Sequence, residues 1–254
     1  RSRGLGDVYK RQRLKKWFLT SNELSMSKFD LVSKKINRVN REIFKDFLYQ
    51  IEPIEMFEPL AETLGAFNNG NPALSYSYID VVKMAGHACP TTAGAFVCCK
   101  KALEKLFPGK TPIRGDISIT IYGEQDEGVY GVIGQVFNLL TGAAPASGFS
   151  GLGHKFRRKD LLKFTPQKID PEAMCFEFRR IDNNQGMLVK FYPQNIPVPQ
   201  GKAEKLAELM PKVLWEVANE NERNEFQNLW MERVKNILID QKEIDNWLII
   251  EKLE

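Results

Sequence analysis

Asp116-Ile-Ser-Ile-Thr-Ile-Tyr122 alternates between apolar and polar residues and is the clearest strand in this 254-residue chain. A period of two places its three isoleucines on one face of a sheet. One helical pattern precedes it, over Thr91 to Phe107, and another follows it, over Val129 to Leu140. Because strands and helices are interspersed in this way, the sequence predicts an α+β fold, with a mixed sheet and packed helices.

The segments before this stretch are expected to be mainly helical. Apolar residues recur at helical spacing over Lys34 to Gln50 and again over Met56 to Phe67. Residues 73–82 combine aromatic and β-branched residues and are expected to turn from strand into helix.

A hairpin and a helical tail are expected after it. Ala173 to Ile181 and Gly186 to Tyr192 are predicted to be two strands, joined by a turn over Asp182 to Gln185. From Gly201 onward the spacing is helical, which predicts two or three helices that pack on the core or on a second copy of the chain.

These patterns predict four parts: a leader over residues 1–25, an N-terminal helix over 26–52, an α+β core over 53–200 and a C-terminal helical extension over 201–254. Residues 1–12 resemble translated sequencing-adapter sequence, and Met26 is the first methionine. We therefore expect the leader to be non-native or disordered and to contribute nothing to function.

Composition excludes several classes of protein. Hydrophobic content of 43% and charged content of 27% are ordinary for a globular domain. The net charge of +4 arises in the first sixteen residues, and the remainder of the chain is slightly acidic. No basic stripe is interleaved with aromatics, so no nucleic-acid partner is expected. The longest apolar stretches are too short to span a bilayer, which predicts a cytoplasmic protein without a membrane partner. Four cysteines without a Cys-x-x-Cys pair favour neither a disulfide framework nor a zinc ribbon.

Gly86-His-Ala-Cys-Pro90 carries the strongest chemical signal. It places one of only two histidines two positions from one of four cysteines, and imidazole and thiolate are preferred zinc ligands. Pro90 suits the first turn of a helix, so Cys89 is expected at the N-cap, where the helix dipole favours a thiolate. The spacing alone leaves three interpretations open: a metal ligand, a reactive thiol, or a chance pair that includes a core cysteine.

Other reactive or charged side chains have simpler interpretations. We expect the remaining cysteines to be core residues; these are Cys98, Cys99 and Cys175. The basic run Arg157, Arg158 and Lys159 is typical of a solvated face, but beside a metal pocket it would favour an anionic substrate.

The motif also resembles a known family. Gly86 to Pro90, followed by a small-residue helix, is similar to the opening motif of the FmdE family of formylmethanofuran dehydrogenase proteins. Asp126 to Gly142 resembles the second block of that family. Gly148 to His154 and Cys175 to Arg180 fall where the family has its glycine-rich loop and a strand with Phe and Arg. The resemblance spans roughly Phe57 to Pro193.

This resemblance implies an α+β core with a metal site, usually zinc, built around His87 and Cys89. Glu127 stands where the family's second block has a cysteine, and glutamate is still a competent zinc ligand, although an acidic residue there also suits a helix N-cap. His154 lies in the glycine-rich loop, where it could complete the ligand shell, act as an acid or base, or simply be exposed. The chain departs from the family in Tyr130, which replaces an aspartate, and in its helical tail, which replaces a zinc ribbon.

Two classes of function follow from these residues. The first is a metal-binding protein with an accessory or metal-handling role. The second is a small metal-dependent enzyme that acts on an anionic small molecule through metal-bound water. Formylmethanofuran chemistry itself needs a molybdenum or tungsten cofactor and iron–sulfur clusters, which four scattered cysteines cannot hold, so the chain is not expected to be the catalytic dehydrogenase.

Overall fold

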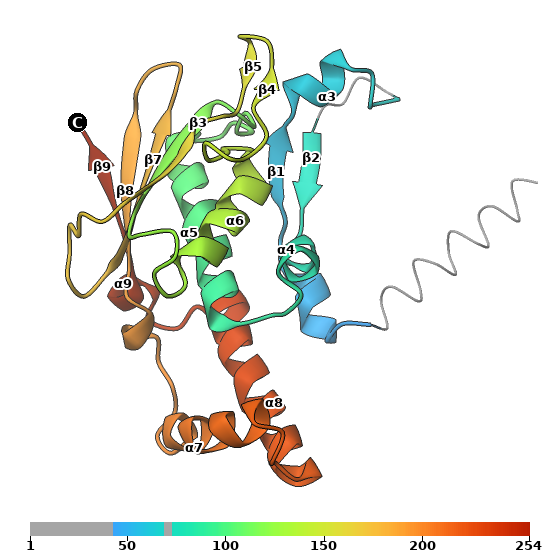
Figure 1. Ribbon diagram of the computed structural model, residues 1–254, viewed down its shortest axis with the longest axis vertical. Coiled ribbons are helices and arrows are strands. Elements are labelled where there is room, and N and C mark those ends of the chain that lie inside the picture. The colour runs from blue at the N-terminus through green and yellow to red at the C-terminus, as the bar shows by residue number, and fades with distance from the viewer. Residues whose placement is uncertain (1–42, 69–72) are drawn as a thin grey trace, which may run out of the picture. The chain divides into compact units, whose positions relative to one another are not determined.

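The computed structural model describes residues 43–68 and 73–254 (Figure 1). The chain divides into two units, residues 1–49 and 50–254. The expected leader lies outside the described residues. Of the helix expected over Lys34 to Gln50, only the last residues are described, and they form the 3-10 helix η1 (Asp46–Gln50) rather than an α-helix.

The second unit combines helices with short strands. Its α-helices are α3 (Pro59–Thr63), α4 (Tyr78–Ala85), α5 (Pro90–Leu106), α6 (Tyr130–Thr141), α7 (Lys202–Leu214), α8 (Glu220–Lys235) and α9 (Ile244–Trp247). Two further helical turns are η2 (Pro193–Asn195) and η3 (Asn236–Asp240), the latter a π-helix that continues α8. None of the described helices is both long and apolar enough to cross a bilayer.

Nine strands are found in the described residues. They are β1 (Ile54–Phe57), β2 (Ala73–Tyr76), β3 (Ile117–Tyr122), β4 (Gly151–Leu152), β5 (Phe156–Arg157), β6 (Leu162–Thr165), β7 (Met174–Arg180), β8 (Gly186–Phe191) and β9 (Leu248–Leu253). Five of them form a mixed sheet in the order β6-β3-β7-β8-β9, in which β3 and β6 are parallel and the other pairs are antiparallel. β1 with β2, and β4 with β5, form separate two-stranded sheets.

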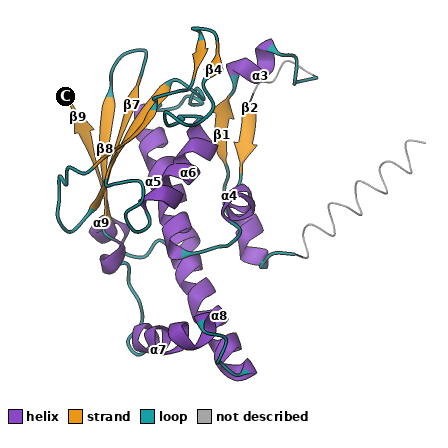
Figure 2. Cartoon of the chain, viewed as in Figure 1, coloured by secondary structure: helices purple, strands orange, loops and turns teal. Residues whose placement is uncertain are grey.

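The fold class is α+β, as the sequence predicts. β3 is the second strand of the main sheet, and its isoleucines Ile117, Ile119 and Ile121 are buried while the residues between them are partly exposed. α5 and α6 pack against this sheet, and the core lies between the two layers (Figure 2). Phe137 of α6 packs edge-on against Phe176 and Phe178 of β7 within that core.

Several predicted elements are confirmed, with small shifts at their ends. These are α5, α6, the strand-to-helix change from β2 to α4, the hairpin of β7 and β8, and the helices α7 and α8. The helix expected over Met56 to Phe67 is shorter than expected, because Met56 and Phe57 belong to β1 and only Pro59–Thr63 is helical. The C-terminal extension is not purely helical either, since its last residues form β9, which pairs with β8 at the edge of the main sheet.

Glycines set the distance between the helices and the sheet. A Cβ atom built on Gly94 of α5 would lie 2.4 Å from Cζ of Phe191, and one on Gly134 of α6 would lie 2.6 Å from Cζ of Phe164. Each aromatic ring therefore occupies the space that a side chain would need, which lets the helix approach the sheet closely. The small residues in the first turns of α5 thus have a packing role.

We expect Gly94→Val to lower the free energy of unfolding by about 1–3 kcal/mol, because the new side chain would overlap the Phe191 ring. Glycine and valine both have low helix propensity, so the change reports mainly on packing. Urea denaturation measures the effect. In a Phe191→Leu background the same substitution should cost less, and an equal cost in both backgrounds would contradict the proposed overlap.

Candidate functional site

The His-x-Cys motif lies in the connection between α4 and α5. α4 ends at Gly86, whose left-handed conformation (φ 75°) turns the chain toward α5. Cys89 is the N-cap of α5 and Pro90 its first residue, as the sequence predicts. The Cys89 Sγ accepts a hydrogen bond from the backbone N–H of Thr92 at 3.4 Å, and the Cys89 N–H donates to Thr92 Oγ1 at 3.3 Å. This reciprocal arrangement is a capping box in which cysteine takes the usual place of serine.

His87 is exposed, whereas Cys89 is only 7% exposed. The His87 Nδ1 lies 2.9 Å from the carbonyl oxygen of Ala85. Because a carbonyl oxygen only accepts, Nδ1 carries the hydrogen, and in the neutral ring the lone pair is on Nε2. The same second hydrogen bond orients the histidines that ligate metals in other proteins.

The C-terminal extension contacts this motif directly, and no local sequence pattern predicts the contact. The indole Nε1 of Trp230, in α8, donates a hydrogen bond of 2.9 Å to the carbonyl of Ala88. The peptide between the two candidate ligands is therefore held by a residue more than a hundred positions away in the chain. In Figure 1, α8 runs from α7 to the N-terminal end of α5.

The other two candidate ligands lie elsewhere. Glu127 is exposed in the turn before α6, and its Oε1 pairs with Lys168 Nζ at 3.2 Å. The alternative role of Glu127 as a helix N-cap is wrong, because α6 begins at Tyr130 with Val129 as its N-cap. His154 is exposed between β4 and β5, a hairpin that Figure 1 shows beyond the end of α5 opposite to the α4–α5 connection.

The positions of these four residues show whether they could share one metal ion. Across residues 43–68 and 73–254, no three histidine, cysteine, aspartate or glutamate side chains are grouped so that they could hold one metal ion. The structure thus does not bring His87, Cys89, Glu127 and His154 together as one ligand set. His87 and Cys89 are the members that neighbour each other in the chain.

The remaining cysteines are confirmed as core residues. Cys98 and Cys99 are fully buried in α5, and Cys175 is buried in β7. Burial raises the pKa of all three thiols, so they stay protonated at neutral pH. Neutral buried thiols are poor nucleophiles and poor metal ligands.

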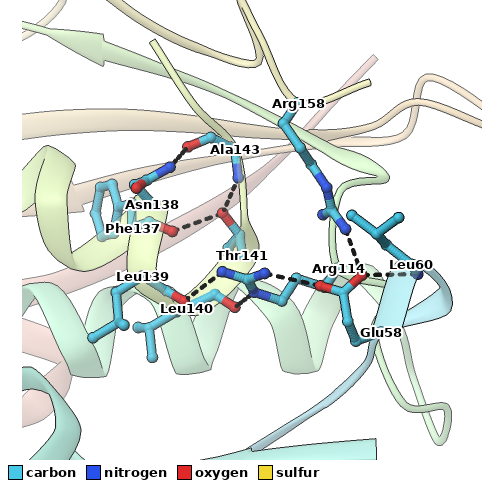
Figure 3. Close-up of polar contacts among 10 residues, drawn as sticks. All are labelled: Glu58, Leu60, Arg114, Phe137, Asn138, Leu139, Leu140, Thr141, Ala143 and Arg158. Atoms are coloured by element: carbon cyan, nitrogen blue, oxygen red, sulfur yellow. Dashed lines mark hydrogen bonds and ion pairs between the residues drawn. The ribbon is translucent and has the colours of Figure 1, made fainter. Parts of the chain in front are cut away.

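A buried group of charges, missed by the sequence analysis, lies near the C-terminal end of α6. Figure 3 shows Glu58 between the guanidinium groups of Arg114 and Arg158. The Glu58 carboxylate is 2.8 Å from Arg114 and 2.6 Å from Arg158. It also accepts a hydrogen bond from the backbone N–H of Leu60, and so caps α3. We call these three side chains the Glu58 cluster.

Arg114 extends this cluster to the end of α6. Its guanidinium donates hydrogen bonds to the carbonyls of Leu139 and Leu140, at 3.1 and 3.3 Å (Figure 3). These carbonyls belong to the last turn of the helix, where backbone acceptors lack partners and a cation is favoured. Arg114 therefore joins the C-terminus of α6 to the carboxylate that caps α3.

Arg158 corrects the expectation of a solvated basic run. It is only 2% exposed, while its neighbours Arg157 and Lys159 are exposed, as the alternation along an extended segment requires. Its guanidinium packs against two backbone positions without side chains, since a Cβ atom on Gly115 or Gly142 would lie 2.0 or 2.6 Å from Nη1. Burial lowers the pKa of Arg158, and the charge of Glu58 opposes that shift.

We expect Glu58→Gln to lower the free energy of unfolding by about 3–5 kcal/mol, because the buried guanidinium of Arg158 and the partly buried one of Arg114 would lose their shared counter-charge. The matched control is Glu127→Gln, which removes an exposed ion pair with Lys168 and should cost about 0–1 kcal/mol. Chemical denaturation of both variants decides the point. Similar losses for the two would show that the Glu58 cluster contributes no more than a surface pair.

Comparison with known proteins does not assign this chain to a family. No protein-family model matches the chain, and no curated protein matches it significantly. The resemblance to the FmdE family of formylmethanofuran dehydrogenase proteins stays a prediction.

Proposed function

We propose that this chain binds one transition-metal ion, zinc in the first instance, through His87 and Cys89, and that its role is accessory or metal-handling. The observation that carries the proposal is the hydrogen bond that His87 Nδ1 donates to the Ala85 carbonyl. It leaves the lone pair of Nε2 for a metal ion, and His87 is two residues from the thiol that caps α5. The resemblance to the FmdE family, which has its metal site at this motif, supports the same assignment.

The donor set favours handling of the ion over catalysis. Zinc in a structural site usually has four protein ligands, and in a catalytic site three. A third ligand from Glu127 or His154 is not favoured, because Glu127 pairs with Lys168 and His154 lies in the β4–β5 hairpin. Two protein donors would leave the remaining positions to water or to a partner, which suits an ion that is exchanged. When bound, the ion would supply Lewis acidity at this position.

We expect the purified chain to carry about one equivalent of zinc, which is the content of a single mononuclear site. His87→Ala and Cys89→Ser should each lose most of this metal, as measured by elemental analysis. Serine is a good N-cap residue, so Cys89→Ser should remove the thiolate while keeping the start of α5 intact. In cobalt-substituted protein, Cys89→Ser should also abolish the thiolate-to-metal charge-transfer absorption.

His154→Ala and Glu127→Gln are the matched controls, since they alter the two candidate ligands that the structure places elsewhere. Both variants should retain the metal content of the unaltered chain. Unchanged metal in His87→Ala and Cys89→Ser would overturn the proposal. Equal losses in His154→Ala would show that the ligand set is larger than the His87 and Cys89 pair.

A further inference from the structure

A cavity of about 240 Å³ lies where the N-terminal ends of α5 and α6 meet the C-terminal extension. Thr91, in the first turn of α5, and Val129, the N-cap of α6, contribute to its rim. The extension supplies the opposite wall from α7 and α8. The cavity adjoins the His-x-Cys motif, because Pro90 lines it and Cys89 precedes Pro90.

Arg233 of α8 brings a positive charge to this cavity. Within the described part of the chain, its guanidinium forms no ion pair with any carboxylate, and its one hydrogen bond is a long contact of 3.5 Å to the Pro193 carbonyl. Its Nε is buried without a hydrogen-bond partner. Burial lowers the pKa of Arg233, and no neighbouring negative charge opposes that shift. Arg158, by contrast, has Glu58 as its counter-charge.

The Arg233 side chain as a whole is half-buried, but its buried Nε lacks a partner among the described residues, so an anion in the cavity would supply both a counter-charge and a hydrogen-bond acceptor. Of the described residues that line the cavity, Arg233 is the only charged one. No carboxylate there competes for an anionic ligand. The positive ends of two helix dipoles, at the start of α5 and α6, act in the same direction as the guanidinium.

The rest of the cavity wall is apolar, so the part of the ligand that contacts it should be apolar as well. It is formed mainly by Met174, Phe191, Met210 and Trp230. Such a surface accepts a hydrocarbon chain or ring, and it disfavours a phosphate group, whose several charged oxygens would all need polar partners. The volume lies below the range of about 300–1,000 Å³ that is typical for drug-sized ligands, so the ligand is small.

We propose that this cavity is a binding site for a small monocarboxylate. The carboxylate pairs with Arg233, and a single ring or short aliphatic chain packs against the methionine and aromatic side chains. This goes beyond the proposed metal site, because it uses neither His87 nor Cys89. It also gives the C-terminal extension a role in ligand binding.

Isothermal titration calorimetry on the full chain tests the proposal, with benzoate and hexanoate as probes. Neutral benzamide is the matched control for charge, and inorganic phosphate is the control for anions in general. Benzoate or hexanoate should bind, and benzamide should bind at least about tenfold more weakly, because its neutral carbonyl forms no ion pair with the guanidinium. Phosphate that binds as tightly as both acids would overturn the assignment to a carboxylate.

Two variants test the place of binding. Arg233→Gln should weaken binding of the acid by about tenfold or more. Val129→Phe should block the cavity while leaving Arg233 in place, since Val129 is 40% exposed at the rim and a larger side chain can be accommodated there. Arg223→Gln, an exposed arginine on the same helix, should bind the acid as the unaltered chain does.

Circular dichroism establishes that each variant is folded before titration. An unchanged affinity in Arg233→Gln, or no binding of either acid to the unaltered chain, would overturn the proposal. Titration after treatment with a chelator separates it from the proposed metal site. Acid binding that persists in the metal-free chain supports the cavity independently, and binding that is lost there would show that the metal, rather than Arg233, holds the carboxylate.

Discussion

One buried carboxylate joins three segments of this fold that are far apart in sequence. Glu58 follows β1 and caps α3, Arg114 precedes β3 and holds the last turn of α6, and Arg158 follows β5. Glu58 and Arg158 are almost completely removed from water and Arg114 is partly buried, so the three side chains must be placed together correctly for the buried charges to be tolerated. The two glycines beside Arg158 are needed for the same reason, because side chains there would displace the guanidinium.

Two arginines of the chain have opposite surroundings: Arg158 is buried beside a counter-charge, and Arg233 is half-buried without one in the described part of the chain. Arg158 has a counter-charge and lies against Gly115 and Gly142, in a space that the fold has closed. Arg233 has no counter-charge among the described residues and borders an open cavity. In the first arrangement the buried charge already has its partner within the fold. The second leaves the buried Nε of Arg233 without a partner among the described residues, and it lies beside the motif that carries the candidate metal ligands.

The fold was predictable where a local pattern was sufficient. Strict alternation identified β3, helical spacing identified α5 and α6, and an Asp-Asn-Asn turn joined the two strands of the β7–β8 hairpin. β9 was missed because its backbone partner is β8, some sixty residues earlier, and its own residues carry no regular alternation. The short strands β4, β5 and β6 were missed for a related reason, since two to four residues are too few to show a period.

The candidate site likewise has a part that the local sequence predicts and a part that depends on tertiary packing. Its local part was determined by the sequence itself: Gly86 turns the chain, Pro90 begins α5, and Cys89 between them must be an N-cap, because these properties depend only on neighbouring residues. What surrounds that motif was decided by the tertiary structure alone. Trp230 reaches Ala88, Arg233 enters the neighbouring cavity, and Glu127 pairs with Lys168. Contacts between residues tens to more than a hundred positions apart depend on how the whole chain packs, and no local pattern encodes them.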